Sequence, residues 1–263
     1  MLIRNSSIFI VFFFFFWGCS TPKYITESSA NLVVSQNILP DSAVVFWLKP
    51  YKDSVELKMS KVISKTSNDL LNIRYKGKID QSRSQEANIA RVCADFMHQT
   101  AQLWASNNPL TKVDLTISNY GGFRVSLFSG NITLGQVYEL SPFDNEIVLV
   151  QLNGLQMDSL LNQIAQKGGC PIANAHITLG EDRWLKATIN GNAFDSRRNY
   201  WVATNDFMQQ GGDGFTALKY PQKKIQTGIL VREALINGFS REFEETGDIN
   251  PRNEDRFIFT ENQ

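Results

Sequence analysis

Histidine is scarce in this chain: His98 and His176 are the only two among 263 residues. A metal centre built on several His ligands is hard to assemble from so few. The sequence also lacks the short motifs of many enzymes, namely HExxH, paired cysteines, GxSxG and a phosphate-binding GK[ST] loop. We therefore expect no metal ligands, no cofactor and no catalytic residue in this chain.

An excess of charge of one sign is also missing, because Lys plus Arg and Asp plus Glu each total 26. Nucleic-acid-binding proteins usually carry a basic stripe, so nucleic acid is not an expected partner. No run of like charges forms a polybasic patch for a membrane surface. The hydrophobic content of 43% is enough for a packed core.

A hydrophobic run long enough to span a bilayer, about 20 residues, is absent. The apolar segment Ile8–Trp17 is shorter and is typical of a signal peptide. Gly18-Cys19 directly follows it and resembles a bacterial lipobox, although Phe16 stands where Leu is usual. We predict a signal peptide at 1–18, lipidation at Cys19 and a lipidated tether at 19–40. The expected location is the bacterial cell envelope, as a periplasmic or outer-membrane lipoprotein; the alternative is ordinary secretion with cleavage elsewhere.

Cysteine is rare as well. Without Cys19, only Cys93 and Cys170 remain. An oxidising compartment would permit a disulfide between them. Cys93 lies in an apolar helical pattern, which favours a small core residue over a disulfide partner.

Apolar residues recur at helical spacing in some segments and at strand spacing in others. This mixture predicts a single α+β (mixed α/β) domain over residues 41–260. No internal repeat or Pro/Gly-rich linker divides it. The expected helices cover residues 51–62, 84–104, 155–167 and 227–243. The expected strands cover residues 112–118, 146–153, 176–179, 185–189, 200–204 and 256–260. The strand at 146–153 is continuously apolar and is therefore expected to be central.

Several positions within these elements carry specific expectations. Pro50 fits the first turn of a helix whose apolar stripe runs from Tyr51 to Val62. Leu155 is expected on the apolar face of helix 155–167, which Gly168-Gly169 would end. His98, late in helix 84–104, is expected to be a surface or capping residue.

Three glycine- or aromatic-containing loops follow or precede these strands: NYGGFR at 119–124, SPFDN at 141–145 and NDFMQQGGDGF at 205–215. Glycines let a ligand approach backbone N–H groups. The guanidinium of Arg124 offers five donors in a rigid arrangement to phosphate or hydroxyl oxygens. Each loop alone is weak evidence for a site, because Gly-Gly usually marks a turn and a single Phe usually belongs to a core.

In order and spacing, the three loops together resemble the C-terminal, substrate-binding domain of the 5′-nucleotidase and UDP-sugar hydrolase family. The family pattern is approximately N-x-G-G-I-R, L-P-F-x-N and Y-x-V-x-x-N-x-F-L-x-x-G-G-D-G-F/Y. The segment RSQEANIARVCADF is similar to a further family motif. Tyr120 and Phe123 depart from the commoner Gly and Ile.

The resemblance implies a role for each matching residue. Phe143 and Phe207 resemble the aromatic pair that sandwiches the nucleobase, and Asp213 resembles the carboxylate that binds ribose hydroxyls. Arg124 corresponds to the arginine near ribose and phosphate. The remaining matches are the polar contacts beside the base, Asn119 and Asn145, and a second arginine, Arg83.

In two-domain members of the family, a separate N-terminal domain carries two metals and hydrolyses the phosphate ester. The resemblance therefore implies a nucleotide- or nucleoside-binding subunit of a secreted 5′-nucleotidase, without its own metal centre. Its expected ligand is a nucleoside or nucleoside 5′-phosphate, and its expected partner is a separate metallophosphoesterase that supplies divalent metals. Two alternatives stay open: a lipid-anchored nucleoside-binding protein that needs no partner, and hydrolysis by this chain at an unrecognised site.

Overall fold

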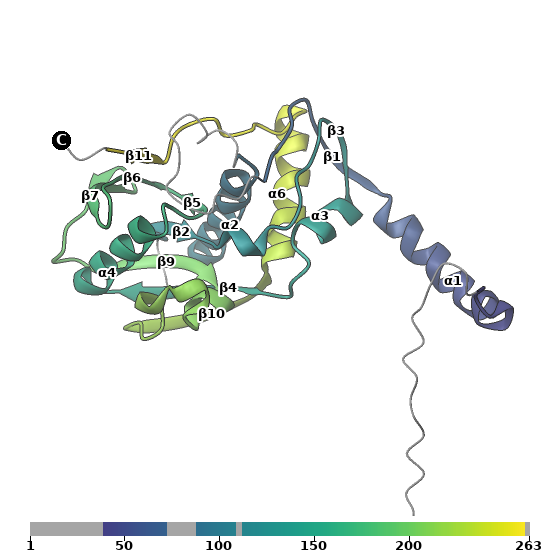
Figure 1. Ribbon diagram of the computed structural model, residues 1–263, viewed down its shortest axis with the longest axis horizontal. Helices are drawn as coiled ribbons and strands as arrows, with labels where there is room; N and C mark the ends of the chain where they lie inside the picture. The colour runs from purple at the N-terminus through teal and green to yellow at the C-terminus, as the bar shows by residue number, and fades with distance from the viewer. Residues whose placement is uncertain (1–38, 73–87, 109–111, 261–263) are drawn as a thin grey trace, which may run out of the picture. The chain divides into compact units, whose positions relative to one another are not determined.

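The structure, a computed structural model, describes residues 39–72, 88–108 and 112–260 (Figure 1). The expected signal peptide, Cys19, nearly all of the tether and Arg83 lie outside these residues. The chain divides into two units, residues 1–47 and 48–263. The described part of the first unit is the beginning of helix α1 (Ser42–Met59), and all later elements belong to the second unit.

The helices of the second unit alternate with short strands. Its further α-helices are α2 (Asn88–Ser106), α3 (Leu134–Leu140), α4 (Gly154–Gln166), α5 (Asp206–Gln209) and α6 (Val231–Thr246). Its strands are β1 (Val62–Thr66), β2 (Leu115–Ile117), β3 (Gly130–Thr133), β4 (Glu146–Leu152), β5 (Ile172–Ala173), β6 (Ala175–Leu179), β7 (Trp184–Ile189), β8 (Asn192–Ala193), β9 (Tyr200–Asn205), β10 (Lys223–Leu230) and β11 (Phe257–Phe259).

Within the described ranges the strands form three sheets, and the principal one has the order β10-β4-β9-β2-β5. Strand β4 is antiparallel to both β10 and β9, whereas β2 is parallel to β9. A four-stranded sheet has the order β11-β6-β7-β8, and β1 pairs with β3. Mixed sheets flanked by helices confirm the predicted α+β class.

Both faces of the five-stranded sheet are covered, which explains why β4 is apolar throughout. Ile147 and Leu149 belong to one hydrophobic cluster, with residues of α2 and α6. Val150 and Leu152 belong to a second cluster, with residues of α4 and β6. Side chains alternate across a strand, so burial on both faces requires consecutive apolar residues. The predicted central position of this strand is confirmed.

Helices α2 and α6 pack closely against each other (Figure 1). Phe96 and Phe239 meet edge to face, with ring centroids 5.0 Å apart. A Cβ at Gly238 would lie 2.2 Å from Cγ of Phe96, so only glycine permits this approach.

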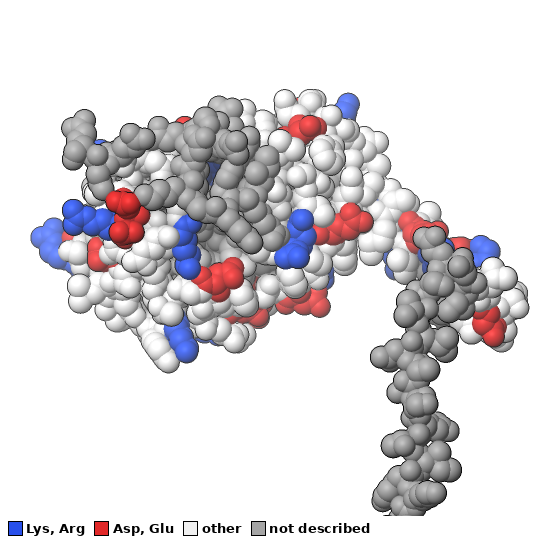
Figure 2. Space-filling view, in the orientation of Figure 1, with Lys and Arg blue, Asp and Glu red and all other residues white. Residues whose placement is uncertain are grey.

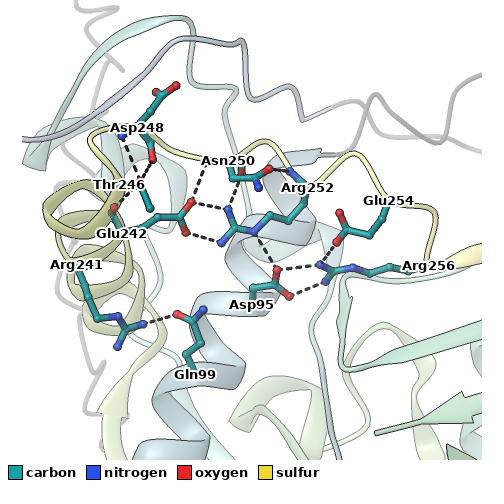
Figure 3. A network of polar contacts seen from close by, with 10 residues as sticks. All are labelled: Asp95, Gln99, Arg241, Glu242, Thr246, Asp248, Asn250, Arg252, Glu254 and Arg256. Atoms are coloured by element: carbon teal, nitrogen blue, oxygen red, sulfur yellow. Dashed lines mark hydrogen bonds and ion pairs between the residues drawn. The ribbon is translucent and has the colours of Figure 1, made fainter. Parts of the chain in front are cut away.

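A polar network ties the C-terminal segment to these two helices (Figure 3). Asp95 of α2 accepts hydrogen bonds from Nε of Arg252 at 3.1 Å and from Nη2 of Arg256 at 2.9 Å. Arg252 also donates from Nη1 to Glu242 of α6 at 2.6 Å, and Arg256 donates to Glu254 at 2.6 Å. The segment that leads to β11 is therefore held by the largely buried ion pairs of Arg252 and Arg256 with Asp95 and Glu242, as well as by strand pairing.

Acidic and basic side chains are interspersed on the face shown in Figure 2, in keeping with the balanced charge of the sequence. None of the helices within the described ranges has the length and apolar character needed to cross a membrane.

Two predicted helix beginnings are wrong. Helix α1 begins at Ser42, so Pro50 lies inside it. Oδ1 of Asp41 accepts from the backbone N–H of Ala43 at 2.8 Å and caps that beginning. Helix α6 begins at Val231, because residues 223–226 pair with β4 and Gly228 has a φ of +73°.

Two predicted side-chain positions are also wrong. Leu155 is 78% exposed, because it lies two residues before Met157 and therefore off the buried stripe of α4. His98 is half-buried, and its Nδ1 lies 2.9 Å from Oγ1 of Thr116 on β2. Cys93 is a core residue as expected, and both it and Cys170 are free and buried.

Candidate functional site

The three loops that the sequence singled out lie at one edge of the five-stranded sheet, where strands β2 and β9 end and strand β4 begins. Ile147, near the beginning of β4, pairs with Asn205 at the end of the antiparallel strand β9. The loop before β4 and the loop after β9 are therefore neighbours. Strand β2 runs parallel to β9, so the loop that follows β2 begins at this same edge.

The loop after β2 is joined to the loop after α5. Nδ2 of Asn119 donates to Oδ2 of Asp213 at 2.8 Å. Asn119 is buried, whereas Asp213 is exposed. The predicted pair of sugar- and base-contacting residues is thus in direct contact across 94 residues of sequence.

The loop before β4 is joined to α5 in a similar way. Nδ2 of Asn145 donates to Oδ1 of Asp206 at 2.7 Å. The same carboxylate oxygen accepts from the backbone N–H of Phe207 at 2.9 Å. Asp206 therefore connects the loop that carries Phe143 to the residue that carries the second aromatic ring.

Both aromatic side chains are exposed, with 46% of Phe143 and 44% of Phe207 accessible to solvent. Large apolar side chains usually bury more of their surface, so two exposed rings on adjoining loops are a notable combination. The guanidinium of Arg124 lies over the Phe143 ring, 5.9 Å from its centroid. Such a position combines an aromatic face with a fixed positive charge.

The two glycines after α5 are each required for a different reason. A Cβ at Gly212 would lie 2.4 Å from Cε1 of Phe207, so the Phe207 ring rests directly on this glycine. Gly211 has a φ of +89°, in the left-handed region that favours glycine. Asp213 also has a positive φ, +50°, a conformation that Asp tolerates better than most residues.

Two replacements in the first loop, Tyr120 and Phe123, pack against the hydrophobic core. Phe123 is completely buried in the core beneath the loop, and Tyr120 packs against the same core. Burial raises the pKa of the Tyr120 hydroxyl well above its usual range. Neither ring is among the exposed groups of the site.

Sequence reasoning missed three residues that hold these loops. Asn205 caps α5 by accepting from the backbone N–H of Met208 at 2.8 Å, and an Asn before a short helix is a recognisable signal. Asp206, beside it, could have been noticed for the same reason. Arg232 in α6 donates to the carbonyl oxygens of Ser141 and Phe143, at 3.3 and 3.4 Å, and nothing local in the sequence indicates this contact.

The hydrogen-bonded loops are distinct from a surface hollow between α2 and α6. That hollow has a volume of about 570 Å³, and His98, Arg241 and Glu242 are among the residues that line it. Within the described ranges, no group of three or more His, Cys, Asp or Glu could hold a metal ion. The described residues therefore do not fit a dimetal centre.

The family profile and the known proteins that match this chain all point to one family. The profile described as 5′-nucleotidase, C-terminal domain, matches residues 62–220. The protein UshA of Escherichia coli is 24% identical over 212 residues, which cover 79% of this chain and 36% of UshA. A 5′-nucleotidase of Vibrio cholerae is 24% identical over 216 residues, covering 80% of this chain and 36% of that protein.

Solved structures show the same fold. A 5′-nucleotidase precursor of Thermus thermophilus aligns with a TM-score of 0.64 and 23% identity, over 84% of this chain and 44% of that chain. The NAD nucleotidase of Haemophilus influenzae aligns with a TM-score of 0.62 and 18% identity, over 85% of this chain and 42% of that chain. The aligned part of the chain thus covers less than half the length of each of these four relatives.

Proposed function

Because the chain belongs to the family of 5′-nucleotidase C-terminal domains, we propose that its three joined loops bind a nucleoside or nucleoside 5′-phosphate. The observation that carries this proposal is the pair of exposed rings, Phe143 and Phe207, on loops joined through Asn145 and Asp206. Base stacking on an aromatic ring contributes roughly 1–3 kcal/mol and tolerates different bases.

The charged groups around the rings suit the rest of such a ligand. Arg124, beside Phe143, can donate to phosphate or ribose oxygens, and the exposed carboxylate of Asp213 can accept from sugar hydroxyls. Arg83 is proposed as a second arginine of the site. Two stacking contacts and a few charge-assisted hydrogen bonds favour binding, while the loss of ligand and side-chain freedom opposes it. The balance corresponds to roughly micromolar to millimolar affinity.

We assign the hydrolysis of the phosphate ester to a separate metallophosphoesterase chain, with this chain as the substrate-binding subunit in the cell envelope. Helix α1 is proposed as the docking surface for that partner, since Tyr51 and Val55 are 73% and 54% exposed. This helix directly precedes the segment that matches the family profile, which supports a position next to a catalytic subunit.

Calorimetric titration with adenosine and AMP tests the binding site. Wild-type protein should bind both, and Phe207→Ala should lower the affinity by roughly 5- to 150-fold through lost stacking. Phe128→Ala is the matched control, because Phe128 is also exposed but lies outside the three loops. Failure of the wild-type protein to bind either compound would reject the proposed function.

A pull-down from the native envelope tests the partner. Copurified AMP hydrolysis that EDTA abolishes is expected, and Tyr51→Glu with Val55→Glu should remove it without changing nucleoside affinity. Binding without any copurified activity would favour the partner-independent binding protein instead. Metal-dependent AMP hydrolysis by the purified recombinant chain would contradict the assignment of hydrolysis to a partner.

A further inference from the structure

Asn205 is buried and is not among the residues expected to contact the ligand. Its side chain is only 3% exposed, at the end of β9. Its Oδ1 accepts from the backbone N–H of Met208 at 2.8 Å, and its Nδ2 donates to Oδ1 of Asn119 at 3.0 Å. Both polar ends of this buried amide are therefore used, which fixes its orientation.

The orientation of Asn119 follows from that of Asn205. Because Oδ1 of Asn119 accepts from Asn205, its Nδ2 is the atom that faces Asp213, and it donates to Oδ2 at 2.8 Å. An ionised carboxylate can only accept hydrogen bonds. If the Asn119 amide were turned by half a rotation, its oxygen would face the carboxylate and its NH₂ group would face the NH₂ group of Asn205. Asn205 therefore selects the orientation that binds Asp213.

The Asp213 carboxylate has little other support. Its backbone has a φ of +50°, between two glycines. Among the residues that the structure describes, Asn119 is its hydrogen-bond donor, through Oδ2, and Oδ1 receives no hydrogen bond. Gly121 leaves space at this contact, since a Cβ there would lie 3.2 Å from Nδ2 of Asn119 and 3.7 Å from Oδ2 of Asp213.

We propose that Asn205 is a positioning residue for sugar recognition. By fixing the amide of Asn119, it holds the Asp213 carboxylate so that Oδ1 is presented to the hydroxyls of a ribose. This inference rests on the proposed nucleoside site and makes it more specific. The preferred ligand class is a nucleoside with free 2′- and 3′-hydroxyls, and discrimination against dideoxynucleosides depends on a residue that does not touch the ligand.

A thermal double-mutant cycle tests the relay without any ligand. Asn205→Asp keeps a capping oxygen for α5, because Asp caps helices as well as Asn, but it replaces the donor to Asn119 by an acceptor. Asn119 must then turn and present its oxygen to Asp213. Adding Asp213→Asn supplies a donor for that oxygen, so the double variant should melt at a higher temperature than Asn205→Asp alone.

The cycle includes Asp213→Asn alone, which gives the effect of removing that charge when Asn205 is intact, and it is measured at 0.5 M salt, where interactions between solvent-exposed charges are screened. No recovery of the melting temperature in the double variant would show that the two positions are not coupled through amide orientation, and would overturn the relay.

A second measurement compares adenosine with 2′,3′-dideoxyadenosine by calorimetry. Wild-type protein should prefer adenosine. Asn205→Asp should lose about tenfold in adenosine affinity, as expected for one lost charge-assisted hydrogen bond, with dideoxyadenosine affinity unchanged. Asn153→Asp is the matched control, because Asn153 caps α4 by accepting from the backbone N–H of Gln156 at 2.9 Å and lies at the opposite end of β4 from the loop that carries Phe143.

The two levels of the proposal fail differently. If wild-type protein binds neither nucleoside, the proposed function and the sugar-recognition role both fall. If wild-type protein binds and prefers adenosine, and Asn205→Asp keeps that preference, the positioning role is overturned while the nucleoside site stands.

Discussion

Arg232 donates a hydrogen bond to the carbonyl oxygen of Phe143, 89 residues earlier in the chain. The guanidinium also donates to the carbonyl oxygen of Ser141, forms an ion pair with Asp144 and lies over the Tyr138 ring, 4.4 Å from its centroid. Arg232 is only 9% exposed. The first turn of α6 therefore holds the loop that presents Phe143 to solvent.

Arg232→Lys should weaken nucleoside binding about tenfold although Arg232 is not expected to touch the ligand. A lysine ammonium cannot reproduce the planar guanidinium that serves several acceptors at once, so the loop would be held less firmly. Calorimetry with adenosine measures the effect. The control is Arg241→Lys on the same helix, where the side chain bonds to Gln99. Equal affinities for the two variants would contradict this role of Arg232.

Gly212→Ala should lower adenosine affinity, and Gly211→Ala should chiefly lower stability. The added Cβ at residue 212 would collide with the Phe207 ring and displace it. At residue 211 a Cβ would meet only Cδ of Lys219, at 3.8 Å, but the φ of +89° is unfavourable for Ala by about 1 kcal/mol. Titration and thermal unfolding of both variants separate the two effects. The prediction fails if both variants lose affinity to the same degree.

His98 should make the protein less stable as the pH falls from 7 to 5. Burial lowers the pKa of His98, an effect that Asp95 opposes and Arg256 reinforces. The unfolded chain then binds a proton more readily than the folded chain, so stability is lost as the pH drops below about 6.5, the usual value for histidine.

His98→Gln should flatten this part of the stability profile, as measured by denaturant unfolding at pH 7, 6 and 5. His176→Gln is the control, because the His176 side chain is exposed on β6. An unchanged slope in His98→Gln would exclude His98 as its source.

Arg252→Gln should destabilise the protein by about 3 kcal/mol, since it leaves a buried carboxylate without its partner. Both Arg252 and Glu242 are largely buried, with 11% and 12% of their side chains exposed. Arg197→Gln is the comparison: this arginine pairs with Asp195 but is 88% exposed, and its loss should not measurably change the melting temperature. Equal effects of the two substitutions would show that the network in Figure 3 adds no stability beyond a surface pair.

The predictable parts of the fold were those whose signals are local. Helix α4 has an apolar stripe and ends at Gln166, shortly before Gly168 and Gly169, both of which have positive φ. The Asn190-Gly191 dipeptide, which is typical of a two-residue hairpin turn, joins β7 to β8. Each of these features is determined by a few neighbouring residues.

The errors arose where distant pairing decides the structure. Residues 227–230 read as part of a helix, yet β4 holds the preceding residues in a strand. The beginning of α1 was missed because residues 43–48 are all apolar and show no helical period.

The same distinction applies to the site. The family resemblance pointed to Asn119, Phe143, Phe207 and Asp213, and the structure places their loops at one edge of the five-stranded sheet. Arg232 could not be found this way, because its role depends on how α6 docks behind a loop. Burial and hydrogen bonding of that arginine become visible only in the folded chain.

The hydrogen bonds that close the site, Asn145 to Asp206 and Asn119 to Asp213, span 61 and 94 residues of sequence. Contacts of such separation form late, because the chain must first lose the entropy of large loops. A fragment or an early folding intermediate with its helices already formed would therefore lack the site. Nucleoside binding should appear with the slowest refolding phase. The signal of a bound fluorescent nucleoside would therefore report when the five-stranded sheet is complete.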